Sequence, residues 1–158
     1  NEHGHYTKDE WTSICDVDKE YDGHKFTLKE YIEVENNYVN FIRELMEYSE
    51  MEFVSVRRLG LYDSISNQIA KDKRYREINE PLKDLDRSLR KGARIHRSKI
   101  GNYIRACLRE LAEISFENKG KGFEFDFGYD YYMHIRSSLP VEQLSQIARQ
   151  NDLFLDPR

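Results

Sequence analysis

The sequence predicts an α+β fold in which several helices pack on a small, mostly antiparallel sheet. Much of the first two-thirds spaces its apolar residues three and four positions apart, as amphipathic helices do. Residues 123–135 instead alternate apolar and polar side chains, as half-buried strands do. No repeat or proline-rich linker divides the 158 residues, a length typical of one domain. We therefore expect a single domain over residues 1–158.

Capping boxes predict the first two helices. In this motif a Ser or Thr hydroxyl and a Glu three residues later each bond the backbone N–H of the other. Thr7 with Glu10 predicts a short helix over residues 7–15, after which an acidic loop follows. Thr27 with Glu30 predicts a helix of about 22 residues, because the apolar residues behind it keep helical spacing for about five turns.

Short elements are expected in the middle of the chain. The β-branched run at residues 53–57 predicts a strand. A helix capped by Asp63 or Ser64 follows it, and Pro81 favours the first turn of another helix. The last helix of this region is expected over residues 100–114, where the apolar side chains share one stripe.

The final quarter changes to a period of two. Residues 123–127 alternate Phe with Glu or Asp, and the alternation resumes after Gly128. This pattern predicts a bulge or bend at the glycine, within one long strand or between two. Pro140 then begins a helix, and residues 153–155 are interpreted as an edge strand.

Composition narrows the class of protein. The chain is 39% hydrophobic and 34% charged, and its 11 Tyr, 8 Phe and 1 Trp supply apolar area that disordered chains lack. No apolar run approaches the roughly 20 residues of a membrane span, and the first residues do not have the features of a signal peptide. Cys15 and Cys107 lack metal-type spacing. We expect a cytoplasmic, soluble domain without disulfides and without membrane contact.

Charge is distributed unevenly along the sequence. Residues 1–53 carry 14 acidic and 5 basic residues, a net charge of −9. Residues 54–110 carry 7 acidic and 15 basic residues, net +8, and residues 111–158 carry 8 and 5, net −3. Folding can bring the zones together so that they cancel, or they can form two surfaces of opposite sign that steer a charged partner. The sequence leaves both interpretations open.

One stretch has the spacing of a calcium loop. Residues 18–23 place carboxylates at alternate positions and a glycine at the sixth, which is how calcium loops wrap oxygen ligands around the ion. The twelfth position should be a bidentate Glu but is Lys29, and Glu30 comes one residue late. No histidines or cysteines have zinc-type spacing. We expect no metal and no cofactor.

Catalytic motifs are equally absent from the sequence. It has no nucleophile elbow, phosphate loop, dinucleotide fingerprint or zinc-binding His-Glu-x-x-His helix. Glu124, Asp126, His134 and Arg136 share one face of the predicted sheet and can converge as an acid–base site. The same pattern is more typical of the solvated face of a strand. We therefore expect a binding protein and not an enzyme.

A basic stretch supports nucleic-acid binding as the alternative function. Residues 83–109 concentrate Lys and Arg, with His, Asn and Tyr between them. Such clusters neutralise phosphates, and aromatic side chains stack on bases, although the chain as a whole is acidic, with a pI of about 5.8. The basic face would consist of Arg87, Arg90, Arg94, Arg97 and Lys99.

A resemblance indicates another function. Residues 127–135 read Phe-Gly-Tyr-Asp-Tyr-Tyr-Met-His-Ile and precede Leu-Pro, a short helix and Leu-Phe-Leu. This stretch resembles the C-terminal part of small immunity proteins from bacterial polymorphic-toxin and contact-dependent inhibition systems. The resemblance implies a non-catalytic antitoxin that binds a cognate toxin domain, often a nuclease. We expect it to be a monomer or weak dimer.

The partner-binding surface is expected to be acidic. Nuclease domains are commonly basic where they meet phosphate, and complementary charge raises association rates and selects partners. The acidic first third of the chain is therefore the expected surface. Its carboxylates are Asp16, Asp18, Glu20 and Asp22 in the loop, and Glu33, Glu44 and Glu47 on the long helix.

Overall fold

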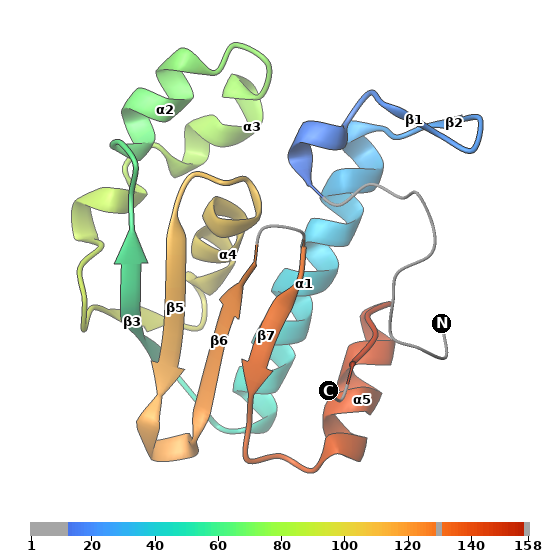
Figure 1. Ribbon diagram of the computed structural model, residues 1–158. Helices are drawn as coiled ribbons and strands as arrows, with labels where there is room; N and C mark the ends of the chain where they lie inside the picture. The colour runs from blue at the N-terminus through green and yellow to red at the C-terminus, as the bar shows by residue number, and fades with distance from the viewer. Residues whose placement is uncertain (1–12, 129–130, 157–158) are drawn as a thin grey trace.

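The computed structural model describes residues 13–128 and 131–156. Its centre is a five-stranded antiparallel sheet in the order β4-β3-β5-β6-β7, with the long helices behind one face (Figure 1). The predicted α+β class is confirmed. The strands of this sheet are β3 (Phe53–Gly60), β4 (Arg94–His96), β5 (Glu113–Asn118), β6 (Phe123–Phe127) and β7 (Met133–Arg136).

Most of the helical residues lie behind the sheet. α1, the longest helix, packs against α4 on one side and α5 on the other, whereas α2 and α3 lie beyond the upper end of β3 (Figure 1). A small hairpin of β1 (Glu20–Tyr21) and β2 (His24–Lys25) precedes α1. The helices are α1 (Leu28–Tyr48), α2 (Ile65–Lys71), α3 (Arg76–Asn79), α4 (Ile100–Leu108) and α5 (Val141–Gln150).

Local sequence signals set the helix starts. Thr27 accepts a hydrogen bond from the Glu30 N–H, and Glu30 accepts one from the Thr27 N–H at 2.8 Å, so the second capping box is confirmed. Ser64 caps α2 in the same way by accepting from the Asn67 N–H. α5 follows directly after Pro140, as expected.

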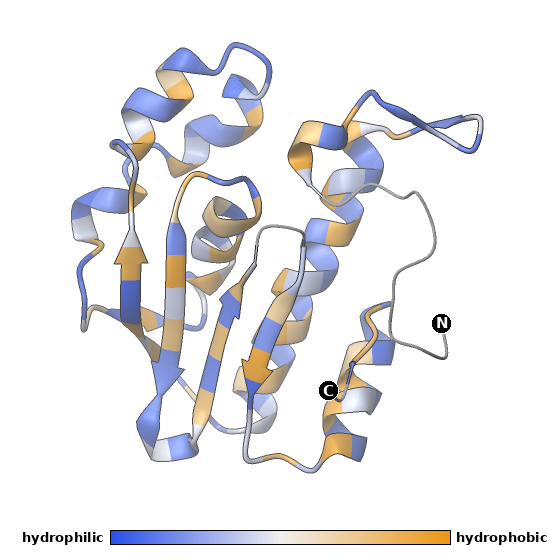
Figure 2. Cartoon of the chain, in the orientation of Figure 1, coloured by the Kyte–Doolittle hydropathy of each residue, from blue (hydrophilic) through white to orange (hydrophobic). Residues whose placement is uncertain are grey.

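The core fills the space between the sheet and the helices. Phe116 of β5 and Phe125 of β6 stack with their ring centroids 4.6 Å apart, and both are buried. Apolar and polar residues alternate along β6 and β7 (Figure 2). Because successive side chains of a strand point to opposite faces, one face of the sheet there is apolar and the other is charged. A smaller cluster, formed around Phe26 and Tyr75, lies under the hairpin.

The predicted helix over residues 100–114 is wrong in its second half. α4 ends at Leu108, and Glu110 adopts a φ of +60°, a left-handed conformation typical of helix ends. Glu113 then begins β5, the central strand. Ile114 continues the helical stripe of α4, but it also alternates with polar neighbours, and pairing with β3 and then β6 decides in favour of the strand.

Two other predicted helices differ from the structure. Pro81 lies in a 3₁₀ turn (Glu80–Leu82), and a second 3₁₀ turn (Leu85–Ser88) follows in place of one α-helix. Leucines three residues apart suit the three-residue period of such turns. The helix expected over residues 7–15 does not extend to residue 15, because Ser13 is extended and caps a separate 3₁₀ turn (Ile14–Asp16). Its beginning, at residues 7–12, lies outside the described part of the chain.

The ends of the predicted strands also need correction. β3 continues to Gly60, three residues beyond the expected end. β6 and β7 are two separate antiparallel strands, and the Gly128 N–H donates to the Tyr132 carbonyl at 2.7 Å just beyond their last pair. The expected edge strand at residues 153–155 does not form; Phe154 is almost fully exposed there.

Across residues 13–128 and 131–156, no helix combines the length and hydropathy that a bilayer crossing requires.

Candidate functional site

The sheet face turned away from the helices collects the charged residues that alternation predicted. Glu124 lies opposite Arg136, and Asp126 lies opposite His134. No helix of the described part covers this face (Figure 1). We refer to it as the uncovered face.

The four residues form surface ion pairs. Glu124 Oε2 lies 2.6 Å from Arg57 Nη1 of β3 and 3.6 Å from Arg136 Nη1. Asp126 Oδ1 lies 3.1 Å from His134 Nδ1. The basic members are all at least half exposed, and exposed pairs of this kind contribute about 0–1 kcal/mol each. Their geometry is that of a solvated sheet face and does not single out an acid–base pair.

A bulge places two consecutive arginines on the uncovered face. The β3–β5 register shifts between Val56 and Arg58, so Arg57 is the extra residue. Arg57 reaches Glu124, while Arg58 lies opposite Ser115 of β5. Without the shift, strict alternation would direct one of the two charges into the core.

A cleft opens where β5 and β6 separate. Their pairing ends at Phe116 and Phe125, and above this point the strands diverge (Figure 1). The cavity between them has a volume of about 600 Å³. We call it the β5–β6 cleft. Its apolar lining includes Leu108, Ile114 and Phe127, and its charged lining includes Arg58, Glu113, Asp126 and His134.

The thiol in the cleft is not prepared for nucleophilic attack. Burial raises the pKa of Cys107 to about 12, so the sulfur stays protonated at neutral pH. Reactive cysteines have the opposite character, with a lowered pKa in an electropositive site. Cys107 therefore acts as a small apolar side chain.

Aromatic packing fixes the β7 side of the cleft. The ring of Tyr131 packs 5.4 Å from Tyr31 and 5.7 Å from Tyr38, both on α1. The Tyr38 hydroxyl donates to the Tyr131 carbonyl at 2.6 Å. Burial raises the pKa of Tyr131 strongly. Tyr131, which precedes β7, is thus held against the longest helix.

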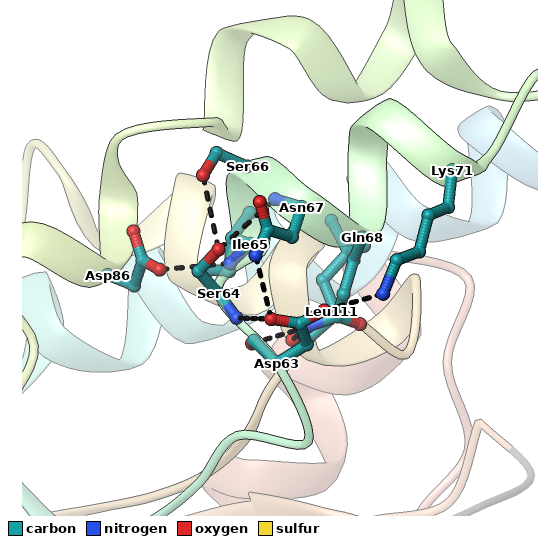
Figure 3. Close-up of polar contacts among 9 residues, drawn as sticks. All are labelled: Asp63, Ser64, Ile65, Ser66, Asn67, Gln68, Lys71, Asp86 and Leu111. Atoms are coloured by element: carbon teal, nitrogen blue, oxygen red, sulfur yellow. Dashed lines mark hydrogen bonds and ion pairs between the residues drawn. The ribbon is translucent and has the colours of Figure 1, made fainter.

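A polar network fixes the opposite side of the β5–β6 cleft, at the turn before β5 (Figure 3). Asp63 accepts hydrogen bonds from the Ser64 N–H, from Asn67 and from Lys71, and these contacts lower the pKa of its carboxyl to about 2. Gln68 donates to the Leu111 carbonyl at 2.9 Å, which ties α2 to the turn before β5. The Tyr131 contacts and the Gln68 hydrogen bond therefore hold the two walls of the cleft in place.

The acidic loop is a hairpin whose carboxylates are partly neutralised. Asp16 accepts from the Ser13 N–H and pairs with Lys19. Asp18 lies 2.8 Å from both Lys25 and Arg74. Glu20 and Asp22 are exposed and make no ion pair with any described residue. As for metals, no group of three or more candidate ligands gathers anywhere in the described ranges.

Two carboxylates of the long helix, Glu44 and Glu47, lie at the end of α1 that is far from this hairpin. Glu33 faces Lys29 at 3.7 Å, and Glu44 accepts from the Asn151 side chain at 2.8 Å. Glu47 is exposed near the end of α1, 14 residues or about 21 Å beyond Glu33. The structure thus separates the predicted acidic surface into two parts at opposite ends of α1, and its role in binding remains a prediction.

The residues of the predicted basic face lie closer together in the structure than those of the predicted acidic surface. Arg87 pairs with Asp84 at 2.9 Å. Among the residues that the structure describes, no carboxylate pairs with the other four members. These four lie on or beside β4, an edge strand, and we call them the β4 edge: Arg90, Arg94, Arg97 and Lys99.

Two other arginines of the basic stretch point inward, which the sequence did not predict. Arg109 holds Glu35 of α1 through two hydrogen bonds of 2.7 Å, and Arg105 adds a third at 3.1 Å. Glu35 is fully buried. One signal was available: Glu35 lies four residues after Tyr31 and four before Val39, on the apolar stripe of its helix.

Comparison with known proteins adds no relative. No protein-family profile, curated protein or solved structure matches the chain. Its function is therefore inferred from its own residues and their geometry.

Proposed function

We propose that this chain is an immunity protein that binds and neutralises a cognate bacterial toxin domain without catalysis, and that the β5–β6 cleft receives part of that domain. It would act in the cytoplasm as a monomer or weak dimer. The observation that carries the proposal is the position of the cleft. Residues 127–135, which carry the resemblance to immunity proteins, supply Phe127, Gly128, Tyr131 and His134 to its lining.

The β5–β6 cleft has the volume of a binding pocket, and its lining combines apolar side chains with charged ones. An apolar lining with a few polar groups at its edge is typical of pockets of about 300–1,000 Å³. Binding energy at protein interfaces concentrates where a side chain enters such a desolvated pocket. The cleft walls are fixed by the aromatic cluster at Tyr131 and by the Gln68 bond. Less conformational entropy is therefore lost when the partner enters.

The charge of the rim suits a basic partner. Glu113 is exposed and accepts a hydrogen bond from Tyr62 at 2.8 Å, and Asp126 is one-third exposed. Arg58 and His134 are the basic groups of the lining. A toxin residue such as Arg or Lys could lay its apolar stem on the floor and place its charge beside Glu113 and Asp126, two of the three carboxylates of the lining. Glu20 and Asp22 of the hairpin form the alternative acidic surface for the same partner.

The test measures how charge reversal at each of these two acidic surfaces changes binding to the product of the adjacent upstream gene. In one variant the cleft carboxylates are reversed (Glu113→Lys with Asp126→Lys). In the matched variant, which has the same change in charge, the hairpin carboxylates are reversed (Glu20→Lys with Asp22→Lys). We expect the cleft variant to bind at least about 30-fold more weakly, the loss typical of a hot spot, and to lose protection of cells that express the toxin.

Each result has a definite meaning. Thermal unfolding of both variants shows whether they remain folded. If only the hairpin variant loses binding, the site moves to the β1–β2 hairpin and the role of the cleft is wrong. If the wild-type chain neither binds the neighbouring gene product nor protects cells from it, the immunity function itself is rejected.

A further inference from the structure

We propose that a second pocket, beneath the β4 edge, binds the phosphate group of a nucleotide or of a nucleic-acid strand. The pocket has a volume of about 240 Å³ and lies between β4, the turn before it and the beginning of α4. It is separate from the β5–β6 cleft and shares no lining residue with it. The inference does not depend on the immunity function.

The lining of the pocket is suited to an anion. Its polar side chains are Ser88, Arg94, His96, Lys99 and Tyr103, and the lining contains no carboxylate. Several arginines elsewhere on the surface are already paired, for example Arg57 and Arg74. Arg94 and Lys99, by contrast, form no ion pair with any residue in the described ranges, so their positive charge is available to a ligand.

Arg94 is held in place without using its hydrogen-bond donors. Its guanidinium lies over the ring of Phe53, 4.1 Å from the centroid. Such a cation–π contact fixes the plane of the group. The guanidinium has five N–H donors in a rigid fork, and no described residue accepts from them. A fork of this kind matches two oxygens of one phosphate, which is the usual bidentate geometry.

His96 contributes a further donor. The Ser98 N–H donates to His96 Nδ1 at 3.2 Å, and the Ser98 hydroxyl lies 2.8 Å from the same nitrogen. Because Nδ1 accepts, the proton of the neutral imidazole is on Nε2, which can therefore donate. The ring also packs edge-on against Phe53 at 5.1 Å, which fixes its orientation.

The combined groups favour phosphate over a carboxylate. Arg94 and Lys99 carry two positive charges, more than the single negative charge of a carboxylate neutralises, and the His96 N–H adds a further donor. Ser88 and Tyr103, whose hydroxyls lie 3.4 Å apart, are further polar residues of the lining. A terminal phosphate offers three acceptor oxygens and up to two negative charges. Arg90 and Arg97 beside the pocket would extend the contact along a longer phosphodiester chain.

The test begins with small probes. Sodium phosphate, AMP and sodium acetate are titrated at constant ionic strength into ¹⁵N-labelled protein, and amide and imidazole resonances are followed by NMR. We expect phosphate and AMP to shift the signals of residues 94–99 and of the His96 ring, and acetate to shift them much less. Equal shifts with acetate, or no shift with phosphate, would reject the phosphate site.

A single-stranded oligonucleotide then separates the two sources of phosphate. Its binding is measured by fluorescence anisotropy over a salt series. The pocket variant is Arg94→Gln with Lys99→Gln. The matched control, Arg149→Gln with Lys121→Gln, removes the same residue types from exposed positions elsewhere. If a strand is the ligand, the pocket variant should lower the slope of log K against log salt by about 1.4, or about 0.7 for each lost phosphate contact.

The outcomes distinguish the ligands. Strand binding that only the pocket variant weakens supports nucleic acid as the source. Shifts with AMP that the pocket variant abolishes, without tighter binding of the strand, support a free nucleotide. If the pocket and control variants bind every probe as the wild type does, the site does not exist.

Discussion

Removal of the Glu35 charge is expected to destabilise the protein strongly. Glu35 is fully buried, and Arg109, its bidentate partner, is 8% exposed. In a Glu35→Gln variant the shape of the side chain is kept, but the Arg109 guanidinium stays buried without a counter-charge. Breaking a buried pair by removing one partner typically costs about 3–5 kcal/mol.

The geometry supports a loss in this range. Three hydrogen bonds to charged groups are weakened, two from Arg109 and one from Arg105, and each such bond contributes about 1.5–3 kcal/mol. The Arg105 side chain is 25% exposed and can regain water, which reduces the total. Arg109 also keeps its bond to the Ile78 carbonyl at 2.6 Å. For a chain of this length, about 3–5 kcal/mol lowers the melting temperature by about 6–20 °C.

Urea unfolding of three variants provides the measurement. Glu33→Gln is the control, because its side chain is 62% exposed and it faces Lys29 at 3.7 Å; its effect should stay within about 0.5 kcal/mol. The double variant Glu35→Gln with Arg109→Gln removes both buried charges and should recover part of the loss, which gives a coupling energy. A Glu35→Gln variant within about 1 kcal/mol of the wild type would refute the reasoning.

Two further predictions concern the cap of α1 and a turn. Hydrogen bonds from the Thr27 hydroxyl, then from its N–H and from His24, hold the pKa of Glu30 at about 2, below its ordinary 4.5. The stability that Glu30 contributes is therefore present above pH 4.5 and is lost as the pH falls towards 2, so wild type and Glu30→Gln should differ at pH 7 and converge in acid unfolding curves. Gly122 has a φ of +59°, and Gly122→Ala should lose about 1–2 kcal/mol in urea unfolding. Gly120→Ala, where the backbone is ordinary and the nearest atom to a Cβ is 3.6 Å away, should lose much less.

The sequence predicted elements where local signals and tertiary contacts agree. The Thr27 capping box and the apolar stripe behind it both specify α1, and the Phe alternation specifies β6. β5 was missed because Ile114 satisfies both the helical stripe of α4 and the strand alternation. Only pairing with β3 and β6, which are distant in sequence, decides between them. β4 has three residues, too few for a periodic signal.

The candidate sites were less accessible to prediction for the same reason. Alternation placed Glu124, Asp126, His134 and Arg136 on one face correctly. The β5–β6 cleft, however, depends on where the pairing of two strands ends, and no local pattern records that. Likewise, the sequence does not separate the β4 edge from Arg105 and Arg109. These two belong to the same basic stretch, but in the structure they point inward and bind Glu35.

Folding resolves the two interpretations of the charge zones in part. Asp18 with Arg74, and Glu35 with Arg105 and Arg109, join the acidic first third to the basic middle third, so part of each charge is cancelled internally. Much of what remains positive lies at the β4 edge. β4 lies two positions from β5 in the sheet, or about 10 Å, and Arg94 pairs with Ser55 whereas Glu113 of the cleft pairs with Gly60, five residues or about 17 Å further along β3, so the two sites are about 19 Å apart. This distance exceeds the Debye length of about 8 Å at physiological ionic strength but is well below the 30 Å at 0.01 M salt. Charge changes at the β4 edge should therefore leave toxin association at the cleft almost unchanged at physiological salt. At low salt they should alter its rate, which makes the two proposed sites experimentally separable.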